Sequence, residues 1–176
     1  MRDVLFICAL FMLSLVKTNA QTNVKINIVL NHVQNLTINP DQQTVNLNYN
    51  TLQDYRNGVQ VTKDAHLSVF STSPYEVNVK LANGQFIKLG GDINESVYMA
   101  EIQITPTSTY ENQNVQFSTS ALTTEGRKII SSQVPTITSV FNIQYSGPKG
   151  DSLIKYSEKN KTITFQNDVL YSIETK

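Results

Sequence analysis

The sequence of 176 residues contains one cysteine, no tryptophan and two histidines. Cys8 lies in the apolar start of the chain, so the remainder has no disulfide, no thiol nucleophile and no thiolate metal ligand. A zinc site needs about three or four ligands at a recognisable spacing, which neither His32 nor His66 has. We expect both histidines to be ordinary residues at strand edges, and we expect no metal and no cofactor.

An excess of charge of one sign is also missing. The 14 basic and 14 acidic residues balance, so the chain has no basic surface of the kind that binds nucleic acid. Beyond Val16, no apolar run approaches the roughly 18 residues of a membrane-spanning helix. We therefore expect no nucleic-acid partner, and no membrane span after the N-terminal segment is removed.

The first twenty residues have the pattern of a cleavable signal peptide. Arg2 provides a positive charge, residues 4–16 form an apolar run, and small residues precede Gln21. As a helix this run spans about 20 Å, too short to anchor in a hydrocarbon core of about 30 Å. The sequence predicts a signal peptide over 1–20, a single domain over 21–176, and a secreted, periplasmic or cell-surface location. An exported chain without disulfides fits a bacterial envelope better than an animal matrix.

The mature sequence is dominated by alternation of apolar and polar residues, which is typical of strands with one buried face. Turn residues separate these runs, and Asn83-Gly84 predicts a two-residue hairpin between its flanking strands. Short strands at this spacing predict an all-β, antiparallel β-sandwich. The main alternating runs are 24–30, 45–49, 77–81, 102–104, 115–117, 141–145, 163–165 and 169–173.

Polar segments between these runs are candidates for recognition. Residues 105–114 and 119–136 are rich in Thr, Ser, Asn and Gln, which predicts loops or irregular strands. The turn at 90–96 offers oxygen ligands for calcium but lacks the EF-hand pattern, so a polar turn is favoured. A glycan is the expected ligand class at these loops. The candidate recognition residues are Asp92, Asn94, Glu95 and Tyr110.

Catalytic motifs are not found in the sequence. It contains no G-x-S-x-G nucleophile elbow, and its acidic residues are scattered without an identifiable pair for glycoside hydrolysis. We therefore expect a protein that is not an enzyme.

Three stretches of sequence carry a family resemblance: NVKINIVLNHVQNLTINP, TVNLNYNTLQDYRNGVQV and HLSVFSTSPYEVNVKLANG. Their order, with DVLYSIETK as a closing strand, resembles the layout of fimbria-like, pilin-like secreted bacterial proteins. This resemblance implies an immunoglobulin-like sandwich and a non-enzymatic structural or adhesive subunit at the cell surface.

The resemblance also implies assembly by β-strand addition, in which an N-terminal strand completes a neighbouring sandwich. The candidate donor side chains are Val24, Ile26, Ile28 and Leu30, and the partners would be the protein itself or related subunits joined through edge strands. Two alternatives stay open. The same strand can pair within its own sandwich, and the protein can be a monomeric surface or periplasmic module that binds glycans.

Overall fold

A computed structural model describes residues 22–91, 95–98, 101–110 and 113–176 of the chain. The chain divides into two units, Met1–Asn31 and His32–Lys176. In the first unit, the described residues 22–31 belong to no helix and no strand. The second unit, called the body below, contains the sheets. The predicted signal peptide, residues 1–20, lies outside the described residues.

The body is built mainly from antiparallel strands, which confirms the all-β prediction. Its helical elements are short: α2 (Leu52–Asn57), η1 (Pro40–Gln42), η2 (Gly150–Ser152) and η3 (Ile154–Tyr156). Within the described ranges, no helix has the length and apolar character needed to cross a membrane. The strands are β1 (Gln34–Ile38), β2 (Gln60–Ser71), β3 (Tyr75–Leu81), β4 (Phe86–Leu89), β5 (Glu95–Val97), β6 (Gln103–Ser108), β7 (Val115–Phe117), β8 (Ser120–Ala121), β9 (Arg127–Ser132), β10 (Thr136–Ser146), β11 (Thr164–Gln166) and β12 (Val169–Thr175).

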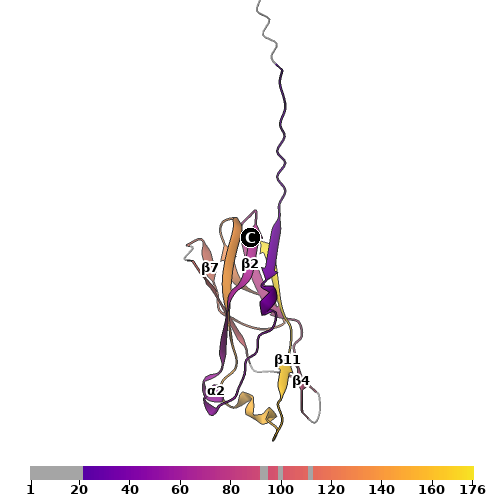
Figure 1. Cartoon of the computed structure of the whole chain (residues 1–176), viewed down its shortest axis with the longest axis vertical. Coiled ribbons are helices and arrows are strands. Elements are labelled where there is room, and N and C mark those ends of the chain that lie inside the picture. The colour runs from indigo at the N-terminus through magenta and orange to yellow at the C-terminus, as the bar shows by residue number, and fades with distance from the viewer. Residues whose placement is uncertain (1–21, 92–94, 99–100, 111–112) are drawn as a thin grey trace, which may run out of the picture. The chain divides into compact units, whose positions relative to one another are not determined.

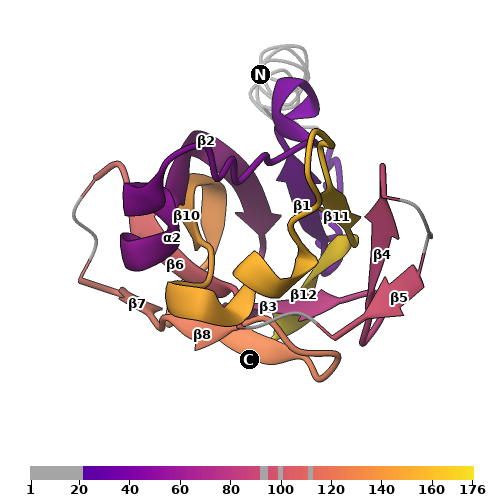
Figure 2. The same ribbon diagram turned by 90° about the horizontal axis from the view of Figure 1, so that it is seen from below.

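Among the described residues, the strands form three antiparallel sheets. Sheet A has the order β1-β2-β10-β6-β8, sheet B has the order β12-β3-β9-β7, and sheet C has the order β11-β4-β5. Sheets A and B enclose the main core and give the body its sandwich-like architecture (Figure 2). In Figure 1, β4 and β11 of sheet C lie toward the same end of the body as α2.

Alternation along the inner strands builds the core. In β3 every second side chain is buried, and the C-terminal half of β10 shows the same pattern. Because successive side chains of a strand point to opposite faces, each inner strand contributes alternate residues to the interior. The most completely buried apolar side chains come from both sheets: Leu67, Val69, Tyr75, Val77, Val79, Ile104, Ile129, Ile130, Phe141 and Ile143.

The prediction of a two-stranded hairpin at Asn83-Gly84 is wrong. β3 pairs with β12 and β9, whereas β4 pairs with β11 and β5, so the two strands belong to different sheets. Gly84 does not adopt the positive φ that a type I′ turn requires. The Asn167 side-chain amide instead donates to the carbonyls of Asn83 and Gln85, at 2.7 and 3.1 Å. A distant side chain therefore holds the turn, and strand pairing across it is not needed.

The prediction of a strand at 45–49 is also wrong, although side-chain burial does alternate along this segment. Val45, Leu47 and Tyr49 are partly buried while their neighbours are exposed, but residues 44–50 belong to no strand. The Tyr49 hydroxyl donates to the Pro148 carbonyl at 2.7 Å. This segment is an extended stretch attached to the body through side chains, without a backbone ladder.

Helix α2 was not predicted, because six residues are too few to show a helical period. Its capping signal is present in the sequence. The Thr51 hydroxyl accepts from the Asp54 backbone N–H, and the Asp54 carboxylate accepts from the backbone N–H of Thr51. Gly58, at a φ of 78°, follows the helix in a conformation that favours glycine.

Two isoleucines of β10 provide a matched test of the core. Ile143 is 0% exposed and Ile137 is 83% exposed. We expect Ile143→Ala to lower the free energy of unfolding by about 2–5 kcal/mol, because it removes buried methyl groups and leaves a cavity. Ile137→Ala should change it by less than about 0.5 kcal/mol. Urea denaturation measures both, and equal effects would contradict this core assignment.

Candidate functional site

The most unusual surface feature of the described chain is the apolar segment 22–31. Its five large apolar side chains are 79–88% exposed. A row of such side chains on a chain with no strand partner is the kind of surface that marks an interaction site. All four predicted donor residues belong to this row. The exposed side chains are Val24, Ile26, Ile28, Val29 and Leu30.

No strand is assigned to residues 22–33, and the first strand of sheet A is β1. The regular sequence pattern is nevertheless that of a strand with one apolar face. The segment therefore combines the side chains of a core strand with the exposure of a tail.

The chain enters the body at His32 and Val33. The Thr72 N–H donates to the Val33 carbonyl at 3.0 Å, which extends the ladder between β1 and β2 by one residue. His32 Nε2 lies 2.9 Å from Ser73 Oγ and 3.4 Å from Thr175 Oγ1. The start of the body and the last residues of β12 are therefore at the same end of the sandwich.

Two edge strands lie next to each other on one side of the body. β1 is the last strand of sheet A and β12 is the last strand of sheet B (Figure 2). The hydrogen bond between Thr72 and Val33 fixes which residues of β1 bond to β2. The odd-numbered residues direct their backbone N–H and C=O groups toward β2. The N–H and C=O groups that point away from β2 are those of Gln34, Leu36 and Ile38.

The free edge of β12 follows from the same argument. The Ala82 N–H donates to the Asp168 carbonyl, and the Lys176 N–H donates to the Pro74 carbonyl. The even-numbered residues of β12 therefore direct their backbone N–H and C=O groups toward β3. The remaining residues direct their N–H and C=O groups away from β3: Val169, Tyr171, Ile173 and Thr175.

The inward-facing side chains of these two edges are incompletely covered. They pack against the core but are only partly buried, unlike the fully buried side chains of the inner strands. Unpaired backbone groups beside partly exposed apolar side chains form a template for a further strand. The side chains concerned are Leu36 and Ile38 on β1, and Val169, Tyr171 and Ile173 on β12.

His66 lies behind this open side, which corrects the expectation of a strand-edge histidine. It is buried on β2, with Nδ1 3.1 Å from Gln42 Oε1 and Nε2 2.9 Å from the Tyr145 hydroxyl. The amide oxygen only accepts, so Nδ1 carries the proton and Nε2 accepts from Tyr145. The Tyr145 hydroxyl lies 2.7 Å from that of Tyr171, which therefore donates to it. This chain of hydrogen bonds joins sheet A to β12.

Burial dominates the acid–base properties of this network. It lowers the pKa of His66, and the nearby Lys63 lowers it further. Burial raises the pKa of Tyr145 to about 12 and also raises the pKa of Tyr171. All three groups are therefore held neutral at pH 7, which suits a structural link and provides no activated nucleophile.

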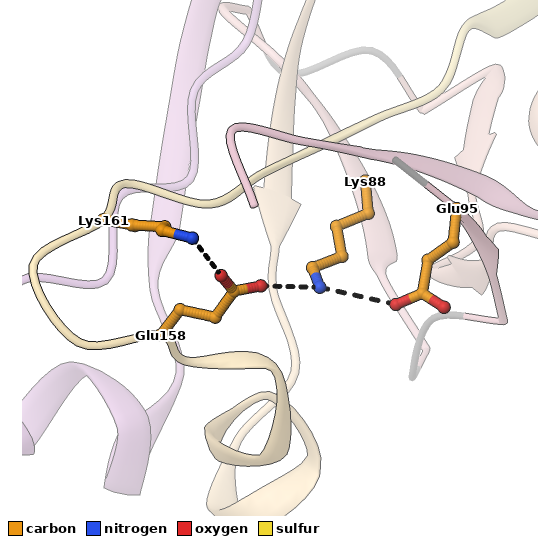
Figure 3. A network of polar contacts seen from close by, with 4 residues as sticks. All are labelled: Lys88, Glu95, Glu158 and Lys161. Carbon is orange, nitrogen blue, oxygen red and sulfur yellow. Dashed lines mark hydrogen bonds and ion pairs between the residues drawn. The ribbon is translucent and has the colours of Figure 1, made fainter. Parts of the chain in front are cut away.

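The predicted recognition residue Glu95 is on strand β5, in an ionic network with Lys88 of β4. Lys88 Nζ lies 3.4 Å from Glu95 Oε1 and 2.9 Å from Glu158 Oε1, and Lys161 Nζ lies 3.1 Å from Glu158 Oε2 (Figure 3). The hydrogen bond to Glu158 raises the pKa of Lys88. The network stabilises the buried charge of Lys88 and joins sheet C to the segment after η3.

The predicted recognition residue Tyr110 follows β6 and is not one of the residues of the Lys88 ionic network. Tyr110 is 80% exposed in the turn after β6, where its backbone N–H donates to Ser108 Oγ. Asp92 and Asn94 lie outside the described residues. The two polar segments also contain regular structure, because β6 includes residues 105–108 and β9 begins at Arg127.

A small pocket of about 270 Å³ lies where β3 and β8 end and β4 begins. Its lining includes the buried Leu81, Phe86 and Leu122 and the exposed Tyr98 and Glu101. Thr123 and Thr124 complete the polar lining. Apolar side chains with a few polar groups are the usual lining of a small-molecule site.

Comparison with known proteins adds no family. Neither a protein-family model nor a curated protein sequence matches the chain. In the described part of the chain, no group of three or more His, Cys, Asp or Glu side chains is arranged to hold a metal ion.

The buried state of His66 predicts a pH dependence of stability. The unfolded state binds a proton near pH 6.5, whereas the folded state binds it only at lower pH. Stability should therefore be full above pH 6.5 and fall as the pH drops toward the folded pKa, by at most about 1.4 kcal/mol per pH unit. Urea titrations between pH 7.5 and 5.5 measure this slope.

His66→Gln is the matched variant for this experiment, because the exposed His32 stays in place. The slope between pH 7.5 and 5.5 should be smaller in His66→Gln than in the unaltered protein. An unchanged slope would assign the pH dependence to groups other than His66.

Proposed function

We propose that this chain is a non-enzymatic subunit of a fimbria-like surface assembly, exported by its signal peptide and joined to its neighbours by β-strand addition. The body would then be an immunoglobulin-like sandwich of the pilin type. One observation carries the proposal: the strand-like apolar segment 24–30 is exposed and belongs to no sheet of the described chain.

The energetics of this segment support a partner. Full burial of one large aliphatic side chain contributes about 1.5–3 kcal/mol, so the inward row of four offers a substantial driving force for docking. Backbone hydrogen bonds between an extended segment and a sheet edge add further affinity. The other face of the added strand carries one apolar residue, Val29, and three polar residues that suit it to water: Asn23, Lys25 and Asn27.

The composition fits the same function. A protein that acts outside the cytoplasm without disulfides must be stabilised by its core, and this body has a large one. The neutral state of the buried His66 network and the salt-bridged Lys88 give no sign of an activated group. The location that goes with this proposal is secreted, periplasmic or at the cell surface.

The proposal predicts that assembly depends on the apolar row of the segment. The mature chain from Gln21 should form species larger than a monomer, measured as mass by light scattering. Ile26→Asn combined with Ile28→Asn should give a monomer, because both side chains that drive docking become polar.

The matched control is Asn23→Ser combined with Asn27→Ser, which changes the polar face of the same segment and should assemble like the unaltered chain. Far-UV circular dichroism should show a folded body in all three proteins. A mature chain that stays monomeric at high concentration would refute assembly by this segment.

A second candidate function is supported by the pocket at Tyr98. A lining that combines an exposed tyrosine, buried apolar residues, a glutamate and two threonines suits a sugar. The apolar face of a sugar ring stacks on an aromatic side chain while its hydroxyls form hydrogen bonds. The chain would then be a surface or periplasmic module that binds glycans, with or without assembly.

This second function predicts that Tyr98→Ala weakens the binding of a neutral hexose by about fivefold to tenfold, the equivalent of about 1–1.4 kcal/mol. Chemical-shift titration with a panel of hexoses measures the affinity. Tyr110→Ala is the control, because Tyr110 is equally exposed but does not line the pocket. Equal effects of the two variants, or no shifts with any hexose, would exclude the pocket as a sugar site.

A further inference from the structure

We propose that the acceptor for this segment is the free edge of β12 on a second copy of the chain, and that the added strand runs antiparallel to β12 with Ile28 opposite Tyr171. This inference rests on the proposed assembly by strand addition. It names the partner, the edge, the direction and the register, which the proposed function leaves open.

Length selects β12 among the described strands that end a sheet. β12 has seven residues, enough to pair with the whole of 24–30, whereas β1, the other free edge on this side, has five. On the opposite side of the body, β7 and β8 have three and two residues, and residues 118–119 join them across the two sheets. The edges of sheet C, β5 and β11, have three residues each.

The inward face fits in this register. The residues of β12 with free N–H and C=O groups are the same residues whose side chains face the core, so each inward pair is also a hydrogen-bonded pair. The donor side chains then cover the partly exposed row on β12 and lie beside Leu36 and Ile38 of β1. The inward pairs are Leu30 with Val169, Ile28 with Tyr171, and Ile26 with Ile173.

The outward face selects the direction. In the antiparallel register, Lys25 lies opposite Glu174, and the apolar Val29 lies opposite Leu170, which is 46% exposed. The parallel direction with the same inward face would place Lys25 opposite Leu170 and Val29 opposite Glu174. Opposite charges and apolar pairs across strands are favourable, so the antiparallel direction is preferred.

The direction in turn requires a second copy. His32, which joins the segment to the body, lies beside Thr175 at the end of β12. A segment that folded back onto its own β12 would reach Thr175 with its C-terminal end and would therefore run parallel to β12. The antiparallel pairing is available only to another molecule. The contact is heterologous, so copies would join head to tail, and the series stays open where the rotation between neighbours does not close a ring.

A cysteine pair tests the register directly, because no cysteine follows Cys8 in the sequence. Val29 and Leu170 would form a non-hydrogen-bonded pair with a Cα separation of about 4.5 Å, within the range of a disulfide. The mature chain with Val29→Cys and Leu170→Cys, oxidised by oxidised glutathione, should give a ladder of covalent oligomers on a denaturing gel without reductant.

The matched control combines Val29→Cys with Glu174→Cys, which would be opposite each other in the parallel direction. It should give no ladder. Cross-linking between copies in this control, or an internal disulfide in a monomer of either variant, would overturn the inference. If the unaltered chain assembles in light scattering but neither pair links copies, strand addition stands and β12 is not the acceptor. If the unaltered chain does not assemble, the proposed function itself fails.

Discussion

Every backbone N–H and C=O group of a sheet needs a partner, and this requirement shapes the body more than any single side chain does. Inner strands satisfy it on both sides, and they contribute the fully buried residues of the core. On one side of the sandwich, β1 and β12 each lack a second neighbour among the described strands. About half of their backbone N–H and C=O groups therefore face solvent instead of another strand. The partly exposed apolar residues there follow from the same open edge.

The segment before the body has the complementary property. Residues 24–30 carry the side-chain pattern of a core strand without a sheet to occupy, and β12 has an edge without a strand. Neither feature requires catalysis, a metal or a cofactor to be meaningful. Their combination in one chain is the physical basis of the proposed assembly. The pocket at Tyr98 is a separate feature, built where three strands end or begin.

Much of the fold could be predicted from the sequence, because alternation is a local signal. It identified β7, most of β12 and the C-terminal half of β10. It failed where the outcome depends on distant partners. Which strands pair with β3 and β4 is decided by β12, β9, β11 and β5, and no local pattern around Asn83-Gly84 contains that information. The alternation at 45–49 reported burial correctly but could not report the absence of a ladder.

The candidate site divides in the same way. The alternating apolar residues of 24–30 could be recognised in the sequence, whereas the exposure of their side chains to solvent could not. The partners of His66, Gln42 and Tyr145, are 24 and 79 residues away along the chain, so only the fold brings them together. Glu95 was predicted in a loop because its ionic partner on β4 has no sequence signature. A sequence predicts the faces of strands well and their neighbours poorly.

The position of His32 beside Thr175 has a consequence for any assembly of the proposed kind. Each added copy would fill one edge and present one new edge, so a growing fibre would have two chemically different tips. One tip would end in an unoccupied β12, and the other in an unused apolar segment. Each tip would need its own kind of cap, and an agent that blocks growth at one would leave the other untouched.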